Sequence, residues 1–155
     1  MKYTNPVWIA MERNRVLGWF LNTRYFKCWI KGLQSFRTVQ GKKGKLGCRT
    51  RMIFQMGKHQ KTIYKTLIQK NIPNCYGFQF DSDYGTSEVR YIFVPLANQQ
   101  TLLETHTHLK LYGFRRLLQY VAPHYFIKKS QLHLEDFKRF AESKESQISE
   151  SMKTV

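Results

Sequence analysis

Cysteine, acidic residues and long apolar runs are all scarce in this sequence. The three cysteines, Cys28, Cys48 and Cys75, are widely spaced, odd in number and form no CxxC motif. They predict neither a disulfide framework nor a zinc site, so we expect reduced thiols. No apolar run approaches the roughly 18–20 residues that cross a bilayer. Charged residues also interrupt the N-terminal segment where a secretory signal needs an apolar region. We therefore expect a cytoplasmic protein without a transmembrane segment.

The shortage of acidic residues leaves a large positive charge. Only 10 Asp and Glu stand against 26 Lys and Arg, which gives a formal net charge of +16. Such a charge attracts nucleic acid, anionic lipid or an acidic partner. The basic residues are spread over every segment, and no nucleic-acid-binding motif is present, so our first interpretation is a solvated basic surface. A surface that binds nucleic acid or an anionic membrane stays open as an alternative, with nucleic acid the less favoured partner.

The longest regular pattern lies near the C-terminus, over residues 113–143. Its apolar residues recur at helical spacing, first in Phe114, Leu117, Leu118 and Val121 and later in Leu134, Phe137 and Ala141. This spacing predicts one long amphipathic helix, with a kink or short break near Val121–Pro123 because proline removes an N–H group. From Glu142 the chain is rich in Ser, Glu and Lys without an apolar stripe. We expect one domain over 1–143 and a disordered tail over 144–155.

Everything before this helix, apart from two short helices, has the patterns of strands. The expected elements are a strand at Val7–Met11, helices at Arg13–Leu21 and Asn22–Gly32, and then strands at 33–40, 48–56, Gln60–Lys70, Cys75–Phe80, Glu88–Pro95 and Thr101–Leu111. The stretch from Gly41 to Gly47 has no phosphate-loop spacing, and DSDYGTS lacks the spaced ligands of a calcium loop, so both are interpreted as turns. Short connections predict an antiparallel meander.

The alternation within the later strands predicts which side chains face inward. One parity is mainly aromatic or aliphatic, namely Tyr76, Phe78, Phe80, Val89, Tyr91, Phe93, Leu103, Thr105 and Thr107. The opposite parity is charged or polar, namely Gln79, Glu88, Arg90, Glu104, His106 and His108. The first set is expected to face the C-terminal helix and the second to face water. The sequence thus predicts an α+β fold, in which a curved antiparallel sheet of about six to seven strands wraps around a long helix.

The order of these elements resembles that of the START-like (SRPBCC, helix-grip) superfamily. The resemblance covers residues 7–143 and rests on VLGWF and YFKCWIKGL, on the glycines of the 41–47 turn, on the strand ending in Ile72-Pro73, on EVRYIFVPL and QTLLETHTHLKLYG, and on the C-terminal helix. Within the superfamily the chain is most similar to bacterial polyketide cyclase/dehydrase-type proteins. The resemblance implies a cavity between the sheet and the long helix. It does not choose among the many roles that this scaffold supports.

Mapped onto this chain, the resemblance implies a largely apolar pocket with a few hydroxyl groups. The candidate ligand-binding residues are Met52, Phe54, Tyr64, Tyr76, Phe78, Tyr91, Thr105, Thr107, Leu118 and Val121. Parity is ambiguous in Gln60–Lys70, which makes Tyr64 the least secure of them. Such a lining suits a hydrophobic molecule with one or two polar groups. The alternative is that these side chains simply fill the interior, because close packing is the norm in protein cores.

Reactive groups are harder to find. Glu104, His106 and His108 share one strand face and could hold a metal with suitable geometry. Parity places them on the wet face, where we expect Glu104 to contact Arg90, so no metal site and no cofactor is predicted. No catalytic triad is visible, and the catalytic residues stay unknown. His124 and His133 lie on the long helix, where either could face the cavity or solvent.

These observations leave three hypotheses about function. The first is binding or carriage of a hydrophobic small molecule or lipid in the cavity between the sheet and the helix. The second is a cyclase or dehydratase acting on an aromatic or polyketide-like substrate, which would require an ionisable residue inside the pocket. The third is a basic surface module for nucleic acid or anionic membrane. The sequence favours a non-catalytic role and names neither the ligand nor the oligomeric state.

Overall fold

The computed structural model describes residues 1–154. The strands are β1 (Lys2–Ile9), β2 (Leu33–Gln40), β3 (Arg49–Met56), β4 (His59–Asn71), β5 (Cys75–Ser82), β6 (Gly85–Leu96) and β7 (Gln100–Leu111). The helices are α1 (Arg13–Leu21), α2 (Phe26–Trp29), α3 (Leu118–Val121) and α4 (Pro123–Lys153), with 3-10 turns η1 (Thr23–Tyr25), η2 (Ala97–Gln99) and η3 (Gly113–Leu117). This order matches the predicted one, although β1 begins earlier than the predicted Val7.

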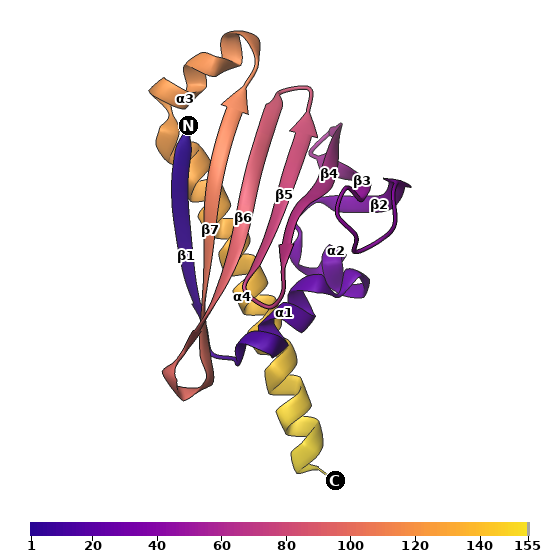
Figure 1. Ribbon diagram of the computed structural model, residues 1–155, viewed down its shortest axis with the longest axis vertical. Helices are drawn as coiled ribbons and strands as arrows, with labels where there is room; N and C mark the ends of the chain where they lie inside the picture. The colour runs from indigo at the N-terminus through magenta and orange to yellow at the C-terminus, as the bar shows by residue number, and fades with distance from the viewer. Residues whose placement is uncertain (155) are drawn as a thin grey trace.

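All seven strands form one antiparallel sheet in the order β1-β7-β6-β5-β4-β3-β2. The strands from β2 to β7 are a meander in which each pairs with the next, because every connection between them is short. The first strand completes the sheet at the far edge by pairing with the last, with Val7 opposite Leu103. Figure 1 shows the sheet curving around α4, which lies along one face, while α1 and α2 close the lower end.

The core lies where α4 and the two short helices meet the sheet. Phe137 of α4 is only 1% exposed. Its ring centroid is 4.8 Å from that of Trp29 and 5.5 Å from that of Phe20. Asn5 of β1 ties the same helix to the sheet edge, since its Nδ2 donates to the Ile127 carbonyl oxygen at 3.2 Å. These contacts fix the second half of the helix firmly against the sheet.

The inward faces of the later strands follow the predicted alternation. Tyr76, Tyr91, Phe93 and Leu103 are buried. Thr105 and Thr107 on the same face of β7 are buried as well. The sheet is therefore apolar on the face that meets α4, as alternation alone predicts.

The predicted break in the C-terminal helix is present. The turn η3 and the short α3 end at Val121, and α4 begins with Pro123 as its first residue. Between them Ala122 has φ −136° and ψ 49°, which is outside the helical region. Proline is favoured at this position, because the N–H group of the first helical residue has no hydrogen-bond acceptor within the helix. The segment 113–121 is thus separate from α4.

The far end of α4 differs from the sequence expectation. The helix continues through Lys153, so residues 144–153, expected as a disordered tail, are helical. Oε1 of Glu145 lies 2.6 Å from Nη2 of Arg15 and accepts a hydrogen bond from Nε1 of Trp19 at 3.2 Å. These contacts attach the polar end of α4 to α1. The sequence of this end alone does not predict them. Within residues 1–154, no helix combines the length and apolar character needed to cross a bilayer.

Candidate functional site

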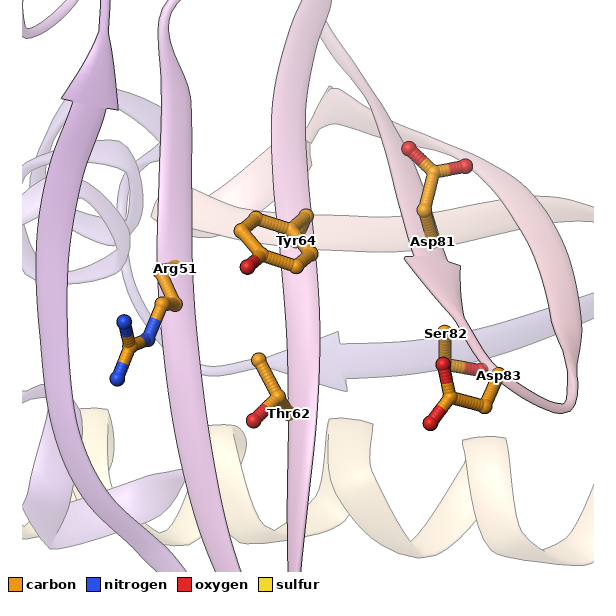
Figure 2. Close-up of a pocket in the computed structure, with 6 residues that line it drawn as sticks. All are labelled: Arg51, Thr62, Tyr64, Asp81, Ser82 and Asp83. Atoms are coloured by element: carbon orange, nitrogen blue, oxygen red, sulfur yellow. The ribbon is translucent and has the colours of Figure 1, made fainter.

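Hollows lie on both faces of the sheet. The outer hollow has a volume of about 380 Å³ and is lined by Arg51, Thr62, Tyr64, Asp81, Ser82 and Asp83. Figure 2 shows these side chains on β3, β4 and β5 and in the turn after β5. Tyr64 is paired with Asp81 across β4 and β5, while the adjacent pair, Lys65 and Phe80, faces the helix. The outer hollow therefore lies on the face turned away from α4.

Asp81, one of the charged residues that line the outer hollow, already has partners. Nη1 of Arg49 lies 3.0 Å from Oδ2 of Asp81 and 3.1 Å from Oγ1 of Thr66. The Arg49 guanidinium also lies 4.6 Å from the ring centroid of Tyr64. Nε2 of Gln79 donates to the second oxygen of Asp81 at 2.8 Å. This network accounts for Asp81 and Tyr64 as residues that stabilise the open face of the sheet, so neither is free to bind a ligand.

The inner hollow has a volume of about 580 Å³ and lies between the sheet and the C-terminal helical segments. Strands β4 to β7 supply one wall, and η3, α3 and the start of α4 supply the other. The lining residues are Lys61, Ile63, Phe80, Ser82, Tyr84, Gly85, Ser87, Leu109, Leu111, Arg115, Leu118, Ala122, Tyr125, Phe126 and Lys129. We call this hollow the inner cavity.

Strand periodicity accounts for the sheet wall of the inner cavity. Lys61 and Ile63 are two apart on β4, and Leu109 and Leu111 are two apart on β7, so each pair faces the same side. Gly85 lets β6 approach β7 closely at the rim. A Cβ atom there would lie 2.2 Å from the backbone oxygen of Lys110, so no larger residue fits without moving the strands.

Three cationic side chains belong to this largely apolar lining. They are Lys61 of β4, Arg115 of η3 and Lys129 of α4, and the lining includes no Asp or Glu. Burial lowers the pKa of the Lys61 ammonium, and repulsion from Lys129 and Arg115 lowers it further. The inner cavity can therefore enclose an apolar body and offer positive charge to a polar group on it.

No family model matches this chain, and no curated protein matches it. Solved structures do resemble it. A protein from Thermus thermophilus superposes with a TM-score of 0.70 at 14% identity, over 92% of this chain and 98% of that one. A START superfamily protein from Mycobacterium smegmatis gives a TM-score of 0.61 at 12% identity, over 86% of this chain and 97% of that one. The chain has a START-like, helix-grip fold.

A third solved structure that resembles this chain is that of an enzyme. The Zhui aromatase/cyclase from Streptomyces sp. R1128 gives a TM-score of 0.67 at 11% identity, over 92% of this chain and 93% of that one. At this level of identity the likeness extends to the fold alone. The resemblance inferred from the sequence, to START-like proteins of the polyketide cyclase type, is therefore confirmed for the fold.

Few of the ten candidate ligand-binding residues meet in the inner cavity of this START-like chain. Only Leu118 lines it. Met52, Tyr76, Phe78, Tyr91, Thr105 and Thr107 are buried in the core, and Phe54 packs against that core. Tyr64 lines the outer hollow, and Val121 is 69% exposed beside the helix break. Their role in ligand binding stays a prediction.

The residues that line the inner cavity were mostly not singled out from the sequence. Phe80 continues the inward row of Tyr76 and Phe78, so parity was a sufficient signal for it. Lys61 and Ile63 lie on β4, whose alternation is ambiguous, and only the pairing of Ile63 with Met52 shows which way they face. Nothing in the sequence distinguishes Arg115 and Lys129 from the many other basic residues.

The candidate reactive groups lie elsewhere. Glu104 contacts the Nε2 atom of the neighbouring His106, and this pair replaces the expected contact of Glu104 with Arg90. No group of three or more metal-ligating side chains is found within residues 1–154. The ring of His133 packs 5.2 Å from that of Trp29, whereas His124 is exposed, and neither histidine lines the inner cavity.

Proposed function

We propose that this START-like chain binds a hydrophobic small molecule or lipid in the inner cavity and carries it without chemical change. The observation that carries the proposal is the 580 Å³ hollow with its walls of Ile63, Phe80, Leu109, Leu111 and Phe126. Its volume lies within the roughly 300–1,000 Å³ range of small-molecule pockets. We place this activity in the cytoplasm, which agrees with the three free cysteines of the described chain.

The make-up of the lining favours binding over the cyclase or dehydratase alternative. The Zhui aromatase/cyclase shares the fold, but a shared scaffold does not transfer an activity. Proton transfer needs a group whose pKa lies near the working pH. The lining of the inner cavity contains no His, Asp or Glu, and among its lysines, tyrosines and one arginine the pKa of Lys61 is lowered toward neutral. Ligand binding without catalysis therefore fits these residues better than a cyclase or dehydratase activity does.

A pair of adjacent substitutions on β6 tests this proposal. Ser87 lines the inner cavity, whereas Thr86 pairs with Asp81 on the opposite face of the sheet. Ser87→Phe would fill part of the cavity, and Thr86→Phe adds the same bulk outside it. We expect the neutral dye N-phenyl-1-naphthylamine to bind the wild type and Thr86→Phe with similar affinity, and Ser87→Phe at least about 10-fold more weakly. Equal binding by both variants, or no binding by the wild type, would overturn the proposal.

A second candidate function is docking on an anionic membrane, favoured by the segment beside the cavity. Phe114 is 84% exposed and Tyr120 is 79% exposed, and Leu117 and Val121 are exposed with them. Such an apolar patch is uncommon on a surface that faces only water. The exposed Arg116 lies within the same segment. Apolar side chains next to basic ones suit the headgroup region of an anionic bilayer.

Sedimentation with lipid vesicles tests this second function. We expect the protein to pellet with vesicles that contain about one-third phosphatidylglycerol and to stay in the supernatant with pure phosphatidylcholine. The double variant Phe114→Ser/Leu117→Ser should lose this association, whereas Leu46→Ser, at an exposed apolar residue in the turn before β3, should keep it. Pelleting that is unchanged in the double variant would show that another surface is responsible.

A further inference from the structure

Three cations from distant parts of the chain meet at the inner cavity. Lys61 is on β4, Arg115 is in η3 and Lys129 is on α4. The ion pairs formed within residues 1–154 use Arg15, Arg49, His106 and Arg139. Within residues 1–154, none of the three cavity cations therefore forms an ion pair with a carboxylate. The lining of the inner cavity contains no carboxylate that could serve as their counter-ion.

The proximity of these three cations is electrostatically unfavourable. Lys61 is partly buried, and burial and the two neighbouring cations together lower its pKa. Like charges in a partly desolvated place repel more strongly than they do in water. Folding nevertheless brings them together, and an anion placed among them would relieve the repulsion.

An aromatic ring holds two of the three cations near one point. The Nζ atom of Lys61 lies 4.7 Å from the ring centroid of Tyr84, and the Cζ atom of Arg115 lies 4.3 Å from the same centroid. Both distances are within the range of a cation–π contact. Tyr84 thus restricts two long side chains that would otherwise be mobile, which lowers the entropy cost of binding an anion with them.

We propose that the ligand of the inner cavity is an amphipathic molecule with an acidic head group, which Lys61, Arg115 and Lys129 bind while its apolar body lies against Ile63 and Phe126. This inference rests on the proposed binding function and adds the chemical class of the ligand. A carboxylate and a phosphate monoester share the required chemistry, since either accepts hydrogen bonds from a guanidinium and an ammonium. Ser87 lines the sheet wall of the same cavity.

Calorimetric titration with three ligands of equal chain length tests the inference. The ligands are dodecanoate, dodecyl phosphate and 1-dodecanol, each below its aggregation concentration. We expect the wild type to bind at least one of the two anions about 10-fold or more tightly than the alcohol, because hydrogen bonds between ions are stronger than neutral ones. The preferred anion then identifies the head group. The preference should shrink as salt increases.

Two variants show whether the named cations are responsible. Lys61→Gln/Arg115→Gln should bind the alcohol as before and lose most of its preference for the anions. Lys58→Gln/Arg37→Gln removes the same charge from exposed residues that do not line the cavity, and it should keep the preference. Equal affinity of the wild type for anions and alcohol would overturn this inference and leave the binding function standing. No binding of any of the three ligands would overturn both. A preference that survives in Lys61→Gln/Arg115→Gln would show that other residues bind the anion.

Discussion

Lys61 and Arg115 share the ring of Tyr84, at 4.7 Å and 4.3 Å from its centroid. Tyr84 follows β5, and its ring positions a cation from β4 and another from the turn after β7. We predict that Tyr84→Leu weakens dodecanoate binding by about 3–10-fold, since the two cations would then lose their mobility only when the anion binds. Tyr84→Phe keeps the ring and should keep the affinity. Calorimetry measures both, and equal losses in the two variants would show that the phenol hydroxyl is the important group.

Lys65 places an ammonium inside the apolar face of the sheet. Its Nζ atom lies 4.9 Å from the ring centroid of Phe26 and 5.0 Å from that of Phe78. Burial lowers its pKa to about 8 from the usual 10.5. We predict that Lys65→Met raises the free energy of unfolding at pH 7 by about 1–2 kcal/mol, because it keeps the apolar stem and removes a charge that burial disfavours. Urea unfolding measures the change.

The same group predicts how stability depends on alkaline pH. Between pH 8 and 10.5 the unfolded chain holds the Lys65 proton while the folded chain releases it, so stability should rise with pH through this window. Lys65→Met should flatten this rise, and the exposed control Lys58→Met should not. A rise of the same size in both variants would contradict the assignment to Lys65.

Protonation of His133 is expected to lower the stability of the folded chain at acid pH. Its ring packs against Trp29, and burial lowers its pKa below the usual 6.5, with a smaller opposing effect from Asp136. The unfolded chain therefore takes up this proton first as the pH falls. The contribution of His133 to stability is complete above pH 6.5 and declines below it. We predict that the melting temperature falls less from pH 7.5 to pH 5 in His133→Gln than in the wild type. An identical fall would exclude His133 as the cause.

Glu145 attaches the end of α4 to α1 through its contacts with Arg15 and Trp19. We predict that Glu145→Gln lowers the free energy of unfolding by about 0.5–1 kcal/mol, because the pair with Arg15 is half-exposed and only the charge is removed. Hydrogen exchange should become faster over residues 142–150 in this variant. Glu150→Gln, on an exposed part of the same helix, serves as the control. Exchange that is equally fast in the wild type would indicate that the helix end frays regardless of this pair.

Strand alternation was sufficient to predict much of the fold. Tyr91, Phe93 and Leu103 are buried as their parity predicts, because one face of an antiparallel sheet is solvated and the other is covered. In β4 both parities include apolar residues, such as Ile63 and Tyr64, so only pairing with a neighbouring strand decides which faces inward. The break before Pro123 was predictable from the chemistry of proline alone.

The position of the inner cavity was not predictable in the same way. Parity shows that Tyr91 and Phe80 share the inner face, but it does not show how far along that face the helices pack. Phe20 packs against Tyr91 with ring centroids 4.8 Å apart, whereas Phe80 lines the open cavity. That difference depends on where α1 and α4 lie in space. The pairing of Arg15 with Glu145 was hidden for the same reason, since the two residues are 130 apart in sequence.

The cavity wall formed by residues 113–121 is attached to the rest of the chain at two unusual backbone positions. Gly113 has φ 58°, and Ala122 has φ −136° with ψ 49°. We expect rotation at these two residues to move the wall, which would also break the contacts of Gln119 with the Met1 ammonium and of Arg115 with Tyr84. The residence time of a ligand should therefore depend on this local opening and not on global unfolding. Substitutions that stabilise the core around Phe137 would then leave the dissociation rate unchanged.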